Sequence, residues 1–303
     1  MNILAVVYQI LVLLMLAASG MFLRKKKILT VPVIKGINST VMVLAWPFLI
    51  LMSTQRDFDS ITNAGFLHVL GLSTLCMGLL SLLLFTVCKK WLSHEKQAVF
   101  TGLCALPNAG FVGIPLVHAF YGDAGVTYLA AYIVAFNLVL WSMYLFFFEG
   151  KFTNPIKAML NPGMIAGVTA TLLLLFRIRI PEPFASFFNQ LASLTTPLIM
   201  ILLGARLIES LNIKQLGDPA VWVSVFIRLI AFPLAVFLIM QLMNIQGMER
   251  GILVLASAMP CASAMQMFSE KYDTDYRLAA QGGALSLVLC LVTIPLVLLI
   301  TGI

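Results

Sequence analysis

The chain has 303 residues, of which 61% are hydrophobic and only 10% are charged. A soluble domain carries about a quarter charged residues, so this composition excludes a soluble enzyme, a disordered protein and a disulfide scaffold. The net charge of +7 argues for cytoplasmic membrane loops rather than for a nucleic-acid partner, because basic residues of membrane proteins gather there. The five cysteines and three histidines form no CxxC pair and no mixed cluster, so we predict neither a metal site nor a cofactor.

Ten apolar segments are long enough, or nearly long enough, to cross a lipid bilayer. In chain order the predicted spans cover residues 3–23, 37–54, 61–88, 97–120, 126–148, 160–176, 187–208, 220–243, 251–268 and 278–302. The basic cluster Arg24–Lys27 follows the first span instead of preceding it, which indicates a retained span and not a cleaved signal peptide. The sequence therefore predicts an all-α polytopic membrane protein.

The loop charges give this bundle an orientation. Of the 19 lysines and arginines, 14 fall in the loops after the first, third, fifth, seventh and ninth spans, four fall in the other loops, and Arg228 lies within the eighth span. Loops rich in Lys and Arg stay in the cytoplasm. We expect an even number of spans with both termini on the non-cytoplasmic side.

Similar motifs recur about 150 residues apart. Ala45-Trp46-Pro47 is echoed by Thr195-Thr196-Pro197, and Leu106-Pro107-Asn108-Ala109 is echoed by Met259-Pro260-Cys261-Ala262. The offset predicts two five-span repeats, residues 1–150 and 151–303, with scaffold and transport domains interleaved from both. Because five is odd, the repeats must be inverted in the membrane, which is a common plan in secondary transporters.

The fourth span contains Pro107-Asn108-Ala109-Gly110-Phe111-Val112-Gly113-Ile114-Pro115. Its prolines remove backbone donors and its glycines permit unusual dihedral angles, so we predict a broken helix. Backbone groups freed at membrane depth must be buried in protein or line a wet cavity. The amino end of the second half-helix would attract an anion. The predicted substrate-binding residues here are Pro107, Asn108, Ala109 and Gly110.

The ninth span carries a matching interruption at Pro260, followed by small and polar residues. The predicted substrate-binding residues of this span are Pro260, Cys261, Ser263 and Gln266. A single proline kink in a membrane helix is more often structural than functional, since proline and glycine are common in such helices. Two breaks at equivalent positions of a repeat, one of them carrying Asn108, favour a binding site where the two spans cross.

The motif Pro107–Pro115 resembles the fourth-span motif of the auxin efflux carrier family, and Asn161–Gly167 is similar to the segment that opens that family's sixth span. The resemblance covers nearly the whole chain. It implies the fold of the bile-acid transporter and sodium/proton antiporter group, a homodimer, and transport of small organic anions such as auxin, malonate or malate. The compact length resembles the bacterial branch, which implies the inner (plasma) membrane. Many members carry Asn at the crossover where this chain has Cys261, Ser263 and Gln266.

Other polar residues leave alternatives open. Arg228, about eight residues inside its span, could bind a substrate carboxylate or extend its side chain to the cytoplasmic surface. Asp123, Asp273 and His118 are candidate proton carriers, although carboxylates at span ends are more often solvated or paired.

The leading hypothesis is an elevator-type secondary carrier of mono- or dicarboxylates or auxin-like acids, not an enzyme. The first alternative is an anion channel or membrane sensor with the same fold. The second is an intramembrane aspartyl protease, which needs two facing carboxylates, whereas Asp123 and Asp273 are predicted on opposite membrane faces. The sequence identifies neither the substrate, nor the coupling ion, nor the direction of transport.

Overall fold

A computed structural model describes residues 3–55, 62–150, 162–210 and 217–303. Over these residues the chain forms helices and no β-strand beyond one isolated bridge. Six helices are long and apolar enough to cross a membrane, at residues 31–53, 63–88, 120–149, 184–205, 219–242 and 276–301, and a shorter apolar helix covers 165–175. The prediction of an all-α polytopic membrane protein is confirmed. Some positions of the prediction lie outside the described residues. They are the predicted span starts at 61 and 160, together with Arg56, Lys151, Lys157, Asn161 and Lys214.

The first half of the chain contains α-helices joined by short π-helical segments (η). Its elements are α1 (Ile3–Lys25), α2 (Val31–Thr40), η1 (Val41–Ala45), α3 (Trp46–Ser53), α4 (Asn63–Cys88), α5 (His94–Ala105), η2 (Ala109–Gly113), α6 (Ile114–Val139), η3 (Leu140–Tyr144) and α7 (Leu145–Glu149).

The second half follows a similar order. Its elements are α9 (Pro162–Leu175), α10 (Phe184–Ser193), α11 (Thr195–Ser210), α12 (Pro219–Phe226), η5 (Ile227–Ala231), α13 (Phe232–Leu242), α14 (Gly247–Ser257), α15 (Ala264–Lys271) and α16 (Tyr276–Thr301).

Several predicted boundaries differ from the structure by a few residues, and two differences are the largest. The second predicted span begins at Val31 rather than at 37, because Pro32 lies in the first turn, where its missing N–H costs nothing. The fourth and fifth predicted spans are not separated by a loop at 121–125. The helix α6 turns a corner at Gly122, whose φ of 63° and ψ of −158° are accessible to glycine and not to most other residues.

Helices α1 and α11 pack with their backbones in close contact. A Cβ added at Gly20 would lie 1.9 Å from the Ile201 carbonyl oxygen, and one added at Gly204 would lie 1.7 Å from the Ala17 carbonyl oxygen. Small residues allow such an approach between membrane helices, where no hydrophobic driving force operates. By contrast, α4 turns leucines such as Leu79 (58% exposed) outward, as expected of a helix that contacts lipid.

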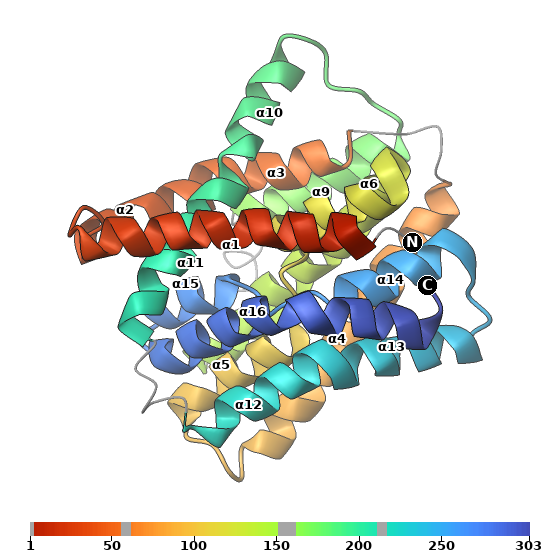
Figure 1. Cartoon of the computed structure of the whole chain (residues 1–303). Helices are drawn as coiled ribbons and strands as arrows, with labels where there is room; N and C mark the ends of the chain where they lie inside the picture. The colour runs from red at the N-terminus through yellow and green to blue at the C-terminus, as the bar shows by residue number, and fades with distance from the viewer. Residues whose placement is uncertain (1–2, 56–61, 151–161, 211–216) are drawn as a thin grey trace.

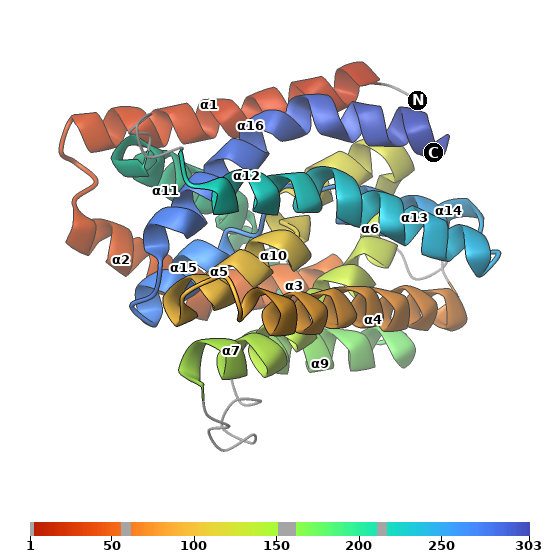
Figure 2. The ribbon, with the colours of Figure 1, turned by 90° about the horizontal axis from the view of Figure 1, so that it is seen from below.

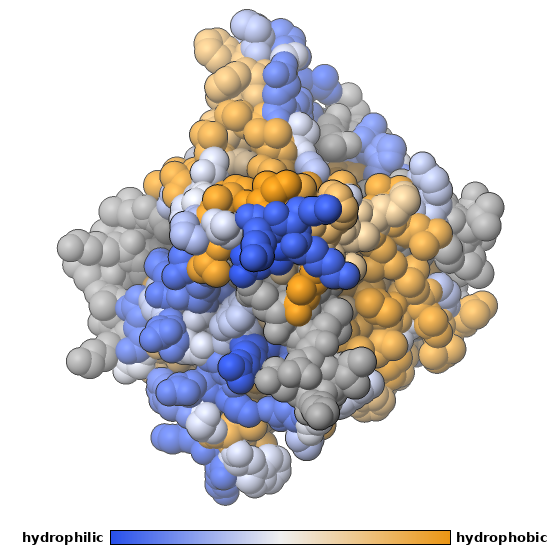
Figure 3. Space-filling view, turned by 60° about the vertical axis from the view of Figure 1, so that its left-hand side comes forward, coloured by the Kyte–Doolittle hydropathy of each residue, from blue (hydrophilic) through white to orange (hydrophobic). Residues whose placement is uncertain are grey.

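Helices run between two ends of the molecule (Figures 1 and 2). The start of α1 and the end of α16 lie near one end in both views. At the other end are the starts of α2, α5, α12 and α16 and the end of α15, since side chains from these segments share a cavity or an ion-pair cluster. Figure 3 turns this end toward the viewer and shows hydrophilic residues gathered in the middle, with hydrophobic surface beside them.

Candidate functional site: two interrupted helices that cross

Two helices stop near the middle of the molecule, and each stop is followed by a short non-helical segment. Helix α5 ends at Ala105, and Leu106 is extended, with φ of −101° and ψ of 114°. Pro107 cannot continue the helix because it lacks an N–H. Helix α14 ends at Ser257, and Pro260 lies in the following segment. The helical path resumes at Ala109 and at Ala264, so both interruptions predicted from the prolines exist.

The two interruptions pair with each other. The Asn108 amide donates to the Pro260 carbonyl at 2.8 Å, and the Ala262 amide donates to the Leu106 carbonyl at 2.9 Å. The result is an antiparallel bridge between Pro107 and Cys261. Backbone groups that the breaks release thus find partners in protein, as they must wherever water is absent.

A third helix fixes the bridge. The Cys261 amide donates to Ser286 Oγ of α16 at 3.0 Å, and the same hydroxyl donates to the Gly283 carbonyl at 2.9 Å. Ser286 is fully buried. Because an unpaired buried amide costs about 1–3 kcal/mol, this hydroxyl stabilises the position of the second interruption.

A small cavity adjoins the crossing. Its lining residues are Trp46, Pro107, Asn108, Gly110, Ile133, Phe136, Ala262, Ser263 and Ala264. Asn108 Nδ2 donates to Ser263 Oγ at 3.0 Å across the two interruptions, which gives the cavity a neutral polar floor. Trp46 and Phe136, whose ring centroids are 6.4 Å apart, contribute apolar walls from α3 and α6. About 20 Å³ is open to the centres of water-sized molecules, which is room for about one water and not for an organic anion.

The amino ends of two helical segments border this cavity. The Val112 amide donates back to the Asn108 carbonyl at 3.1 Å, and the Met265 amide donates to the Ala262 carbonyl at 3.1 Å. These are the first helical bonds after each break. Amides of a first helical turn have no acceptor within their own helix and form the positive end of its dipole. Gly110 and Ala264, both in such first turns, line the cavity.

The structure brings together most of the predicted binding residues, but not all. Pro107, Asn108, Gly110 and Ser263 line the cavity. Pro260 and Cys261 take part through their backbone atoms, and Ala109 is buried beside them. Gln266 lies elsewhere: it is buried, and its Nε2 lies against α16, 2.7 Å from where a Cβ on Gly283 would be.

Sequence reasoning missed the wall residues and Ser286. Trp46 precedes Pro47, whose repeat equivalent is Pro197, and this recurring proline was a usable signal for a site near the crossing. Ile133, Phe136 and Ser286 carry no such signal, because nothing in their local sequence separates them from ordinary residues of an apolar span.

Arg228 is completely buried, in η5. It donates from Nη1 to the Cys104 carbonyl at 3.4 Å and from Nη2 to the Ser257 carbonyl. Its guanidinium carbon lies 4.5 Å from the centroid of the Phe232 ring. The side chain therefore does not extend to the surface, and the snorkelling alternative was wrong. Arg228 is also absent from the lining of the small cavity.

The three candidate proton carriers do not form one cluster, because Asp273 lies apart from His118 and Asp123. His118 Nε2 lies 3.6 Å from Asp123 Oδ1, and both side chains are more than half exposed. Asp273 is exposed beyond the end of α15. Tyr121, two residues before Asp123, lies against Gly251 near the start of α14, whereas Asp273 follows the end of α15. The two aspartates therefore lie near opposite ends of the α14–α15 segment. The facing carboxylates of an aspartyl protease are absent at this pair.

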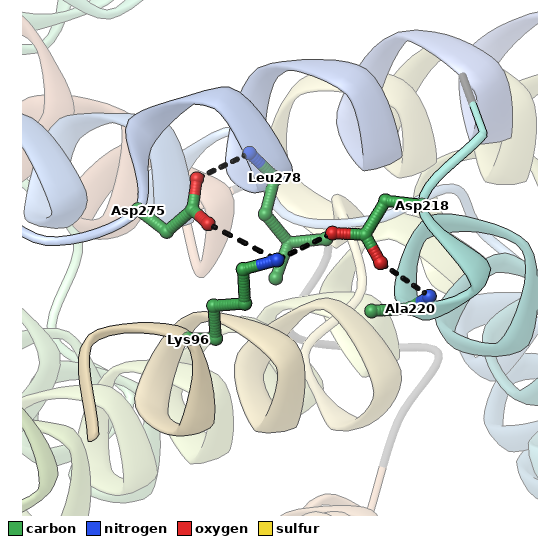
Figure 4. Close-up of polar contacts among 5 residues, drawn as sticks. All are labelled: Lys96, Asp218, Ala220, Asp275 and Leu278. Carbon is green, nitrogen blue, oxygen red and sulfur yellow. Dashed lines mark hydrogen bonds and ion pairs between the residues drawn. The ribbon is translucent and has the colours of Figure 1, made fainter. Parts of the chain in front are cut away.

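A cluster of three charges joins the beginnings of three helices (Figure 4). Lys96 Nζ of α5 lies 2.5 Å from Asp218 Oδ2 and 3.9 Å from Asp275 Oδ2. Asp218 and Asp275 also cap α12 and α16 by accepting from the Ala220 and Leu278 amides, each at 2.9 Å. The hydrogen bond to Asp218 raises the pKa of Lys96. Burial acts to raise the pKa of Asp218, but the bonds from Lys96 and Ala220 outweigh it and lower that pKa.

A larger cavity opens at the same end, between α2 and the turn from α15 to α16. It is lined by Val31, Ile34, Lys35, Ser269, Glu270, Asp273, Thr274 and Tyr276. About 300 Å³ is open to the centres of water-sized molecules. The chain segments on either side, α2–α3 and α15, are the same ones that border the small cavity at the crossing.

An apolar helical bundle whose interrupted helices pair at depth is an architecture typical of secondary transporters. The family described as membrane transport protein matches residues 5–154 and 151–298. The chain therefore belongs to this family of membrane transport proteins, the auxin efflux carrier family that its fourth-span motif resembles.

Similar curated proteins carry names of the same kind. An uncharacterized transporter of Methanocaldococcus jannaschii, MJ1031, is 30% identical over 287 residues, which cover 89% of this chain and 91% of that protein. An uncharacterized transporter of Methanothermobacter thermautotrophicus is 26% identical over 298 residues, 95% of each chain. The uncharacterized transporter YfdV of Escherichia coli is 24% identical over 216 residues, 67% of this chain and 68% of its own.

Proposed function

We propose that this membrane transport protein is a secondary carrier of small organic anions that binds its substrate at the crossing of the two interrupted helices. One observation carries the proposal: Asn108 and Ser263, from interruptions 155 residues apart, join in one hydrogen bond on the floor of a cavity. A chain that breaks two helices at membrane depth loses stability at both. A binding site explains why both breaks border the same cavity.

The packing supports ten spans in two inverted five-span repeats. Helix α1 packs on α11 and, at the equivalent positions of the other repeat, α9 packs on α3. In the same way α4 contacts α5 and α6, while α13 contacts α14 and α16. The proximity of the two chain ends in Figures 1 and 2 supports an even number of spans. The two family matches meet near residue 150, where we place the repeat boundary.

The chemistry of the cavity suits an anion with an apolar body. Its lining includes the neutral Asn108 and Ser263 side chains and two residues of first helical turns, Gly110 and Ala264. Such amides bind carboxylates through hydrogen bonds and the local dipole. None of the described residues that line the cavity is charged, while Trp46 and Phe136 offer contact to a hydrocarbon or ring. We expect Pro107, Ala109, Pro260 and Cys261 to act by shaping the backbone.

Transport requires the cavity to open, because the closed form has room for about one water. We propose an elevator-type movement of the crossing past the wall formed by α2 and α3, which alternately exposes the site to the two sides. The larger cavity beside Lys35 lies on the end that carries the basic loops, and we assign that end to the cytoplasm of a cell with this protein in its inner membrane. Both termini then lie outside. The homodimer stays a prediction.

The first test is ligand binding by the purified protein. Pyruvate, indole-3-acetate, malonate and succinate are screened for thermal stabilisation of the wild type, of Asn108→Ala and of Asn63→Ala. Asn63 is exposed at the start of α4 and serves as the matched control. We expect the ligand to stabilise the wild type and Asn63→Ala. For Asn108→Ala we expect a ligand affinity at least tenfold lower than that of the wild type. Equal stabilisation of all three proteins would remove Asn108 from the binding site.

The second test separates a carrier from a channel. In proteoliposomes, uptake of the ligand that stabilises the protein is measured as a function of concentration and of unlabelled ligand inside. A carrier gives saturable uptake that internal ligand accelerates, because the loaded site returns faster than the empty one. An ohmic current without saturation would favour the channel alternative.

A further inference from the structure

Arg228 is a fixed charge inside the bundle. Of all charged side chains that the structure describes, it alone is buried, and it is buried completely. A charge in a membrane interior is costly unless it is compensated. Yet no carboxylate forms an ion pair with Arg228 among the described residues, so its compensation must come from another source.

That source is the backbone of the two interrupted helices. The carbonyl of Cys104 belongs to the last turn of α5, and the carbonyl of Ser257 belongs to the last residue of α14. The last carbonyls of a helix lack intrahelical donors. They also carry the negative end of the helix dipole, equivalent to about half an elementary charge. One guanidinium that bridges two such ends meets about one unit of opposite partial charge.

The interrupted helices therefore have two chemically different sides at their crossing. On the carbonyl side, Arg228 holds α5 to α14. On the amide side, the first turns after each break border the small cavity. Helix dipoles redistribute charge but add no net charge, so the net charge of the crossing is that of Arg228.

We propose that Arg228 is a positioning residue that also supplies the net charge of the crossing. That net charge is plus one when the crossing is empty and zero when the crossing holds a monocarboxylate. This inference rests on the proposed carrier function. In a carrier that alternates between two sides, the empty crossing then moves a cation through the membrane field, whereas the crossing loaded with a monoanion moves none. Net transport is voltage-sensitive for that reason, and one-for-one exchange of monocarboxylates is not.

The experiment uses the full chain in proteoliposomes with labelled pyruvate and indole-3-acetate. Net uptake into empty vesicles and exchange into preloaded vesicles are each measured at zero potential and at 100 mV set by a potassium gradient with valinomycin. A unit charge crossing the whole field changes an equilibrium about fifty-fold at 100 mV, and a quarter of the field changes it about threefold. We expect net uptake to change by threefold or more and exchange to change by less than 1.5-fold, about the scatter of such assays.

Three variants assign the effect to this side chain. Arg228→Gln is expected to lose the voltage sensitivity of net uptake. Arg228→Lys is expected to retain it, but with a lower maximal rate, because an ammonium group cannot reproduce a planar fork between two carbonyls. Lys271→Gln removes an exposed cation at the end of α15 and is expected to behave as the wild type. A purely structural role of Arg228 would lower rates without changing their response to voltage.

The outcomes separate the two proposals. If neither acid is carried by the wild type, the proposed function falls and this inference falls with it. If the acids are carried but net uptake and exchange respond equally to voltage, the inference alone is overturned. The same holds if Arg228→Gln remains as sensitive as the wild type. Should Arg228→Gln fail to fold, the comparison of the two modes in the wild type and in Arg228→Lys still decides.

Discussion

Helices meet in two different ways in this molecule. One is the contact between α1 and α11, and the other is the crossing of α5–η2 with α14–α15. The first is a contact of continuous helices in which Gly20 and Gly204 let backbones touch. The second is a contact of broken helices in which backbone groups and the Arg228, Asn108 and Ser286 side chains exchange hydrogen bonds. Shape alone determines the first, and the satisfaction of polar groups determines the second.

The difference explains where function can reside. At the α1–α11 contact both helices run without interruption past Gly20 and Gly204, and a continuous helix bonds its interior backbone groups within itself. At the crossing, each break supplies hydrogen-bond partners to the other, and residues of both first turns border a cavity. A scaffold needs the first kind of contact and a binding site needs the second, and this chain places them in one bundle of helices.

The largest effect is expected at the scaffold contact. Gly204→Ala places a methyl group 1.7 Å from the Ala17 carbonyl oxygen, which is backbone and cannot move aside. Overpacking of this kind costs about 3 kcal/mol or more, and the melting temperature should fall by several degrees or the protein should not purify as a single species. Gly36→Ala, with no atom within 4 Å of the new methyl group, is the control. Equal melting of both variants would contradict the close approach.

The next effect concerns the anchor of the crossing. Ser286→Ala removes the acceptor of the Cys261 amide and leaves that amide buried without a partner, which costs about 1–3 kcal/mol. Ser142→Ala is the control, since Ser142 is exposed and bonds only within its own helix. Thermal unfolding monitored by size-exclusion chromatography measures both. If Ser286→Ala melts like Ser142→Ala, the interruption does not depend on α16.

A smaller change is expected at the cavity floor. Ser263→Ala removes the acceptor of Asn108 Nδ2 and should cost about 1 kcal/mol of stability, with a clearer loss in ligand affinity. Ser224→Ala is the matched control, because Ser224 of α12 is buried, lines neither cavity and donates to the Val221 carbonyl three residues earlier. Titration of a stabilising carboxylate against both variants gives the affinities. The floor assignment fails if the two bind alike.

The smallest effect belongs to the charged cluster. Lys96→Met should lower stability at neutral pH by about 0.5–1 kcal/mol, since both partners are about one-third exposed and solvent screens the pair. Because the pKa of Asp218 is lower in the folded protein, its ionised carboxylate stabilises the fold at pH values above its unfolded pKa of about 4. This stabilisation is lost as the pH falls below that pKa. Because the pKa of Lys96 is higher in the folded protein, its ammonium group stabilises the fold at pH values below about 10. This stabilisation is lost as the pH rises further. The stability difference between wild type and variant, measured by melting from pH 3 to 11, should therefore be widest between about pH 5 and 9. A stability difference that grows toward pH 3 or toward pH 11 would contradict the two pKa shifts.

The sequence by itself determined where helices form and where two of them break. Long apolar runs such as that of α4 become helices because a backbone in lipid must bond to itself. Pro107 and Pro260 end helices because each lacks a donor, whatever surrounds them. The family resemblance that the Pro107–Pro115 motif indicated was confirmed by a family match over residues 5–154 and 151–298.

Only the tertiary structure decided which groups meet across the breaks. The partners Asn108 and Ser263 are 155 residues apart, and Arg228 reaches carbonyls 124 and 29 residues away. Such pairings depend on how helices pack, and a residue inside an apolar span carries no local mark of the side it faces. That is why Arg228 was left between cavity and surface, Gln266 was placed at the cavity, and Ser286 and Phe136 were not anticipated.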